Sequence, residues 1–81
     1  MATLDSLRGV FRSALALPDD FDVDDLQYRG IEKWDSLAHM ALVTELEDAY
    51  GIMIDTDDVI DMSSFTKARK IIEKYGVQFD D

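Results

Sequence analysis

The chain has no cysteine, one proline and one histidine among its 81 residues. The absence of cysteine excludes disulfide bonds and thiolate metal sites, so any thiol chemistry has to come from an attached group. A single histidine, His39, cannot build a zinc site by itself. No stretch approaches the ~20 apolar residues of a membrane span, and no cationic segment followed by an apolar run opens the chain. We therefore expect a soluble, cytoplasmic protein without a metal site.

Basic residues are also scarce, with 8 Lys and Arg against 18 Asp and Glu and a formal net charge of −10. Such a field repels nucleic acid and anionic membranes and attracts basic protein surfaces. The hydrophobic content of 47% is nevertheless too high for an acidic disordered segment. We expect one small domain over residues 1–81, a monomer with basic protein partners, and no binding of nucleic acid or membrane.

The first helical pattern begins after Thr3, a plausible cap, and ends before Pro18. Its apolar residues recur three and four positions apart, at Leu4, Leu7, Val10, Phe11, Ala14 and Leu15. From Leu17 to Trp34 the pattern dissolves into a long acidic connection, and connections of this length are uncommon in compact domains. Its isolated apolar residues predict that it wraps around the core: Phe21, Leu26, Ile31 and Trp34.

A second helix opens at Asp35 or Ser36 and runs to Tyr50, where Gly51 supplies a left-handed stop. One face of this helix is predicted to point into the core, with His39, Leu42, Val43, Leu46 and Tyr50. The opposite face carries large apolar groups beside carboxylates, namely Leu37, Met40, Glu47 and Asp48. An exposed apolar spot rimmed by charge is typical of a docking surface.

Two shorter patterns follow. Residues 56–60 can form a short helix with acids at its N-terminal end, and a last helix begins at a capping serine, Ser63 or Ser64, and ends at Gly76. We predict an all-α bundle of three to four helices with a long loop between the first and second helices. Its expected core contains Leu7, Phe11, Leu42, Leu46, Ile54, Phe65 and Ile72.

Ser36 stands where the long polar connection becomes helical. A hydroxyl in the first turn of a helix can carry a phosphate ester, because free backbone N–H groups and the helix dipole favour an anion there. The same serine can instead be a simple N-cap. Half of the basic residues lie in the last helix, so we expect the surroundings of Ser36 to be acidic.

The string Asp35-Ser36-Leu37, opening an acidic amphipathic helix after a long loop in a small all-α chain, resembles the acyl carrier proteins. The resemblance extends over essentially the whole chain. It implies that Ser36 is esterified by 4′-phosphopantetheine from coenzyme A, whose thiol holds an acyl or aminoacyl group as a thioester. It makes Asp35 an adjacent recognition residue, and it makes one helix face the surface that partner enzymes recognise: Leu37, Met40, Glu47 and Asp48.

The same resemblance implies a carrier with no catalytic residues of its own. Its partners would be a phosphopantetheinyl transferase and an acyl-activating or ligating enzyme, a synthase or a transferase with a basic docking patch. Many members have a glycine two residues before the Asp, whereas Lys33-Trp34 precedes Asp35 here, and Ala41 stands where fatty-acid carriers often have a carboxylate. The resemblance therefore spans fatty acid, polyketide, lipopeptide and related pathways and favours a free-standing, specialised carrier of an acyl cargo.

Other interpretations remain open at this point. An unmodified acidic helical adaptor that binds a basic partner would share the same composition and helices. His39 lies one turn from Ser36, but no acid or oxyanion device accompanies it, so we expect a packed histidine, and Trp34 is expected to be a core or loop anchor.

A calcium-binding loop is a third interpretation, because Asp20, Asp22 and Asp24 alternate as in an EF-hand. Asp25 stands where the turn glycine is needed, and Ile31 stands where the bidentate glutamate belongs. The pattern fails at both positions, so a solvated acidic surface is the better interpretation.

Overall fold

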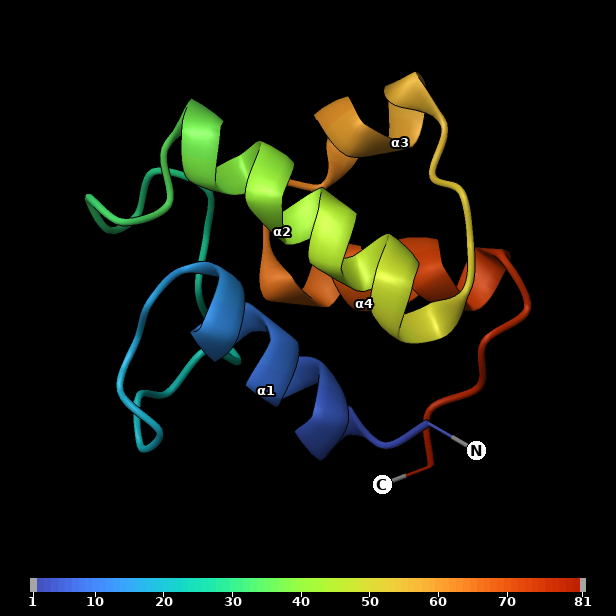
Figure 1. Ribbon diagram of the computed structural model, residues 1–81, viewed down its shortest axis with the longest axis horizontal. Coiled ribbons are helices and arrows are strands. Elements are labelled where there is room, and N and C mark those ends of the chain that lie inside the picture. The colour runs from blue at the N-terminus through green and yellow to red at the C-terminus, as the bar shows by residue number, and fades with distance from the viewer. Residues whose placement is uncertain (1, 81) are drawn as a thin grey trace.

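A computed structural model describes residues 2–80, which form α1 (Leu4–Ala14), α2 (Ser36–Tyr50), α3 (Thr56–Asp61) and α4 (Phe65–Lys74). Within these residues there is no strand, and β-pairing is confined to isolated bridges between Ala2 and Phe79 and between Gln27 and Ser64. Figure 1 shows α1, α2 and α4 gathered around a common interior, with the short α3 beside α2. The predicted all-α bundle with a long loop between its first and second helices is confirmed.

Hydrogen bonds from side chains start three of the helices where the sequence predicts. Thr3 accepts from the Ser6 amide, and Ser64 accepts from the Lys67 amide. At the start of α2, Asp35 Oδ1 accepts from the Ala38 amide at 2.9 Å, so Asp35 is the N-cap and Ser36 is the first helical residue. The hydroxyl of Ser36 is thereby free for other contacts.

The ends of the helices differ in how far local sequence predicts them. Gly51 ends α2 with φ 63°, as expected for a left-handed glycine stop. In α1 the last helical residue is Ala14, well before Pro18, because Ala16 adopts φ 55° and turns the chain away. A left-handed alanine is uncommon, and no sequence pattern indicates it.

The core contains all seven side chains expected in it, and also residues of the long loop, whereas His39 and Tyr50 on the predicted core face of α2 are only partly buried. Phe11 makes edge-to-face contacts with Phe65, at 5.0 Å between ring centroids, and with Trp34, at 5.5 Å. Each such buried side chain contributes about 1.5–3 kcal/mol relative to its exposed state. The loop supplies three buried apolar residues, Val23, Leu26 and Trp34. The predicted wrapping of the loop is therefore confirmed, and the loop is part of the core.

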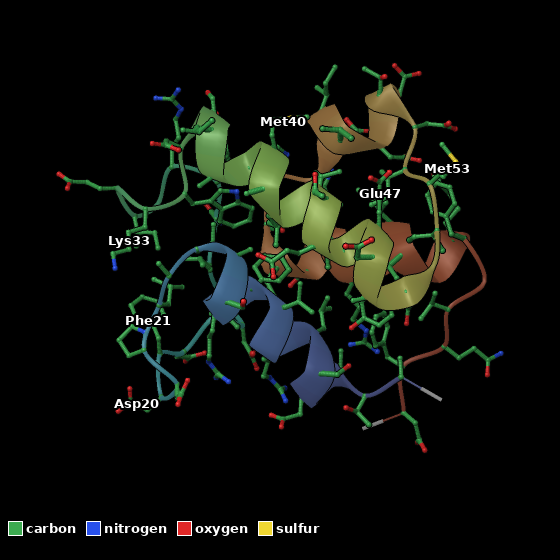
Figure 2. All side chains as sticks on the ribbon, in the orientation of Figure 1. Asp20, Phe21, Lys33, Met40, Glu47 and Met53 are labelled. Atoms are coloured by element: carbon green, nitrogen blue, oxygen red, sulfur yellow. The ribbon has the colours of Figure 1, made fainter. Side chains whose placement is uncertain are left out.

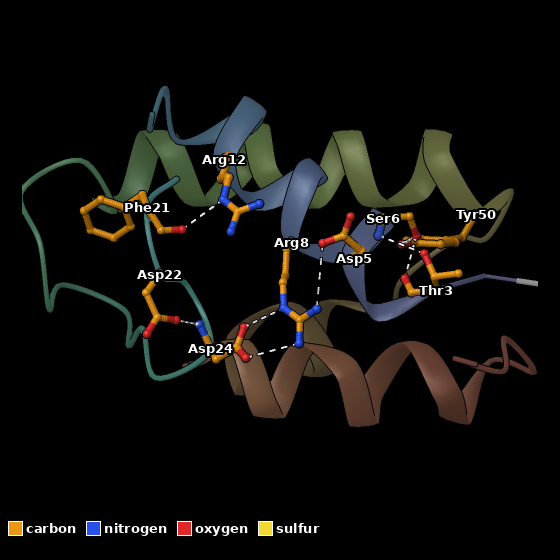
Figure 3. A network of polar contacts seen from close by, with 9 residues as sticks. All are labelled: Thr3, Asp5, Ser6, Arg8, Arg12, Phe21, Asp22, Asp24 and Tyr50. Carbon is orange, nitrogen blue, oxygen red and sulfur yellow. Dashed lines mark hydrogen bonds and ion pairs between the residues drawn. The ribbon is translucent and has the colours of Figure 1, made fainter. Parts of the chain in front are cut away.

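Polar contacts fasten this loop to α1 (Figure 3). Arg8 Nε donates to Asp24 Oδ1 at 2.8 Å, and this bond holds the pKa of Asp24 below its usual value. Arg12 Nε donates to the Phe21 carbonyl at 2.9 Å, and Asp22 accepts from the Asp24 amide. These alternating acids therefore have local structural partners, and within residues 2–80 no three His, Asp or Glu side chains gather as a metal site.

One buried carboxylate attaches α3 to α4. Asp58 is only 7% exposed, and it accepts hydrogen bonds of 2.6 Å from Lys74 Nζ and 2.6 Å from the Tyr75 hydroxyl. These bonds lower the pKa of Asp58. Tyr75 in turn accepts from the Asp55 amide, so the start of α3 and the end of α4 share one polar network. The sequence predicts the short helix but not this buried acid.

The described ends of the chain lie side by side at one end of the bundle (Figure 1). The Asp80 amide donates to the Ala2 carbonyl at 2.8 Å, and the rings of Phe79 and Tyr50 contact each other at 5.6 Å. Because Tyr50 is the last residue of α2, this is the end of α2 opposite Ser36. In the part of the chain that the structure describes, no helix combines the length and apolar character that crossing a membrane requires.

Candidate functional site

Ser36 is an exposed residue at the beginning of α2, and its hydroxyl makes two side-chain contacts. Ser36 Oγ and the Tyr28 hydroxyl share a hydrogen bond of 2.9 Å. Arg29 Nη2 donates to the same oxygen at 3.3 Å. Neither contact seals the hydroxyl inside the protein. The oxygen is therefore reachable from outside and lies beside a cation.

A tight turn presents Tyr28 and Arg29 to Ser36. The Gly30 amide donates to the Gln27 carbonyl at 2.8 Å, which closes the turn, and the Arg29 amide donates to the Trp34 carbonyl at 3.1 Å. Gly30 is required here because a Cβ would lie 2.9 Å from the Gln27 oxygen. Arg29 has φ 64°, a left-handed conformation that costs a non-glycine residue about 1–2 kcal/mol. The turn is thus defined by several bonds and directs two side chains at one hydroxyl.

The electrostatics of the site follow from these contacts. The hydrogen bond with Ser36, and after it the neighbouring Arg29 guanidinium, lower the pKa of Tyr28. The neighbouring Tyr28 side chain raises the pKa of Arg29. The expectation of purely acidic surroundings for Ser36 is therefore wrong, because the fold brings Arg29 onto the serine. The only available signal was a basic residue next to a turn glycine shortly before a helix start.

His39 is occupied by structural partners on both ring nitrogens. Trp34 Nε1 donates to His39 Nδ1 at 2.9 Å, and His39 Nε2 lies 2.8 Å from the Val59 carbonyl oxygen. Because an indole N–H can only donate, Nδ1 accepts and Nε2 carries the proton that it donates to Val59. The predictions of a packed histidine and of an anchoring Trp34 are confirmed. No ring nitrogen is left to act as a base toward Ser36.

The face of α2 singled out by the sequence is divided in the structure. Leu37 is 82% exposed, Met40 is 54% exposed, and Asp48 is exposed. Glu47 is half-buried instead, and its Oε2 accepts from the Ile54 amide at 2.8 Å, which secures the segment after α2. Glu47 therefore has a structural partner within the fold, unlike the three exposed residues predicted for the same face.

Two further large apolar side chains are exposed that the sequence patterns do not single out. Met53, between α2 and α3, is 86% exposed and projects outward in Figure 2, and Ile60 on α3 is 73% exposed. The exposure of Ile60 could have been predicted from its position in a short helix, because a helix of this length buries only one of its faces. The segment around α3 thus adds apolar surface to that of α2.

Open hollows lie at both ends of α2. One of about 440 Å³ adjoins the start of the helix and is lined by Arg29, Gly30, Ile31, Glu32, Trp34 and Asp35. A larger one of about 600 Å³ lies between Ala2, Tyr50 and Val77, at the opposite end from Ser36. The smaller hollow is the relevant one for chemistry at the serine, because Arg29 and Asp35 line it.

Comparison with known proteins bears on what this site belongs to. No family model matches the chain. The chain is 31% identical over 72 residues to acyl carrier protein 1, chloroplastic, of Cuphea lanceolata, an alignment that covers 89% of this chain and 51% of the relative. The chain thus spans about half the length of this curated relative. The helix order, the serine exposed at the start of an acidic second helix and this similarity agree with one another, and over most of its length the chain resembles the acyl carrier proteins.

Proposed function

We propose that this chain is a carrier, not an enzyme, and that Ser36 is the attachment residue for 4′-phosphopantetheine. The observation that carries the proposal is the exposed Ser36 hydroxyl, which starts α2 without serving as its cap. The residues around it fit the group, because Arg29 supplies a cation and a hollow of about 440 Å³ adjoins the site. Bound there, the group would supply a thiol that carries an acyl chain as a thioester, which a chain without cysteine cannot supply itself.

The attachment would proceed at Ser36 Oγ on the surface of a phosphopantetheinyl transferase. The serine oxygen would form a bond to phosphorus while a pyrophosphate P–O bond of coenzyme A breaks, and 3′,5′-ADP would leave with that electron pair. The hydroxyl proton would pass to a base of the transferase. The exposure of Ser36 at the tip of a helix supports access by such an enzyme.

Partner enzymes would recognise the exposed side of α2, where Leu37 and Met40 lie near acidic residues that include Asp48. With a net charge of −10, the protein would be steered toward basic patches, and such steering raises association rates without requiring tight binding. A shuttle that visits several enzymes needs this fast and reversible contact. We propose an acyl-activating or ligating enzyme, a synthase or a transferase as those partners.

The wider context is part of the same proposal. The cargo would be an acyl or aminoacyl group, and the pathway would be a fatty acid, polyketide, lipopeptide or related specialised one. The chain would work in the cytoplasm as one monomeric carrier domain. The similarity to an acyl carrier protein supports the carrier role.

A loading experiment tests the attachment. The protein is incubated with coenzyme A and a promiscuous phosphopantetheinyl transferase, and its intact mass is measured. We expect the wild type and Ser63→Ala, a control at another exposed serine, to gain the mass of one phosphopantetheinyl group. Ser36→Ala should gain nothing and keep its helical circular dichroism, because Asp35 caps α2. A wild type that keeps its mass is an unmodified adaptor and contradicts the proposal.

A further inference from the structure

Arg29 is an unusual cation in this protein because its guanidinium is directed at a neutral hydroxyl. Three other basic side chains pair with carboxylates, namely Arg8 with Asp24, Arg69 with Glu73 and Lys74 with Asp58. Arg12 and Lys33 donate to backbone carbonyls instead. Within residues 2–80, Arg29 forms no ion pair, and its side chain lies over the Tyr28 ring and donates to Ser36 Oγ. In a protein with a net charge of −10, one arginine thus contacts the proposed attachment residue, Ser36.

The backbone at this position is costly for arginine. Arg29 has φ 64°, which glycine or asparagine adopts more readily, and the turn is held there by the bonds of Gly30 to Gln27 and of Arg29 to Trp34. Strained residues that persist because the surrounding structure defines them are concentrated at functional sites. The side chain of Arg29, and not its backbone preference, is therefore the feature that explains its presence.

We propose that Arg29, with Tyr28, binds the phosphate that links the arm to Ser36; this inference rests on the proposed function. When the serine proton is replaced by a phosphoryl group, anionic oxygens take positions next to Oγ. Arg29 Nη2 at 3.3 Å and the Tyr28 hydroxyl at 2.9 Å from Oγ already point at that place. The guanidinium fork matches phosphate oxygens and forms charge-assisted hydrogen bonds with them.

The same contact resolves an electrostatic conflict at the start of α2. The carboxylate of Asp35 is needed as the N-cap, yet it lies beside the residue that would carry a second negative charge. Arg29 provides the opposite charge at Ser36 and lines the same hollow as Asp35. The base of the arm is thus held against the loop at residues 27–35, and modification ties this loop to α2.

The test compares apo and modified forms of three proteins: wild type, Arg29→Gln, and Lys70→Gln, which removes one positive charge from exposed surface on α4. Glutamine at position 29 keeps a comparable backbone cost, so the cation is the main difference. Loading is driven to completion with excess transferase and checked by mass. The 31P chemical shift of the phosphodiester and the change in Tm on modification are then measured.

We expect modification to raise the Tm of the wild type and of Lys70→Gln, and we expect Arg29→Gln to lose that rise and to show a displaced 31P resonance. Arg29→Lys, which keeps the charge without the fork, should restore part of both effects. Complete loading of Arg29→Gln with the wild-type 31P shift and the wild-type rise in Tm would overturn the inference while leaving the proposed function intact. A wild type that does not load would overturn both.

Discussion

Asp35 is the N-cap of α2 in the structure, and we propose that it is also a recognition residue; substitutions can separate these two roles. Asp35→Ala removes the cap, and such a loss costs about 1 kcal/mol within a range of about 0.5–2. In a domain of this size, 1 kcal/mol lowers Tm by roughly 4–8 °C. Asp35→Asn keeps a capping oxygen and loses only the charge at the helix start, for which about 0.3–1 kcal/mol is the typical effect.

Two assays on the same three proteins distinguish these roles. Thermal unfolding followed by circular dichroism should order them wild type, Asp35→Asn and Asp35→Ala, with the alanine variant least stable. The initial rate of loading by the transferase should instead fall equally in both variants, since both lack the carboxylate. Equal Tm losses in the two variants would refute the capping argument. Loading rates that follow stability and not charge would refute the recognition argument.

Three further predictions concern other parts of the bundle. Asp58→Asn should lower Tm at neutral pH. Because the bonds to Lys74 and Tyr75 lower the pKa of Asp58, the stability that its carboxylate contributes is complete above the ordinary carboxyl pKa of 3.8 and is lost as the pH falls below it. The Tm values of wild type and Asp58→Asn should therefore converge in acid, and a difference that persists there would contradict this assignment. Leu46→Ala, at a fully buried site, should cost about 2–5 kcal/mol in denaturant unfolding, and a loss under 1 would contradict the assigned core. Leu37→Ala, at an 82% exposed site on the same helix, should change stability by less than about 0.5 kcal/mol yet slow transfer to a partner enzyme, and an unchanged transfer rate would count against the docking face.

Features decided by neighbouring residues could be predicted from the sequence. Thr3 and Ser64 cap helices because their side chains reach amides three residues on, and Gly51 ends α2 because glycine adopts the required left-handed φ without a steric cost. The core residues followed from helical periodicity for the same local reason. Trp34 could be assigned to the core because a large aromatic residue in an acidic loop has few other favourable environments.

The features that could not be predicted depend on partners brought together by the fold. Asp58 looked like a helix-start acid, and its burial follows from Lys74 and Tyr75 on another helix. Glu47 looked like a surface carboxylate, but the chain returns to place the Ile54 amide on it. Arg29 contacts Ser36 because its own backbone adopts a left-handed φ that reverses the direction of the loop. Charge and periodicity carry no information on such encounters.

The pairing of Ala2 with Phe79 has a practical consequence for how this protein can be handled and linked. Both residues lie by Tyr50, and α2 separates them from Ser36 by about 20 Å at 1.5 Å per residue. A fusion near either residue would therefore lie at the end of α2 opposite the Ser36 hydroxyl, whether the fused part is a purification tag, a surface anchor or a second protein. Copies of the domain linked near Ala2 and Phe79 would each leave the Ser36 end of α2 accessible to an enzyme.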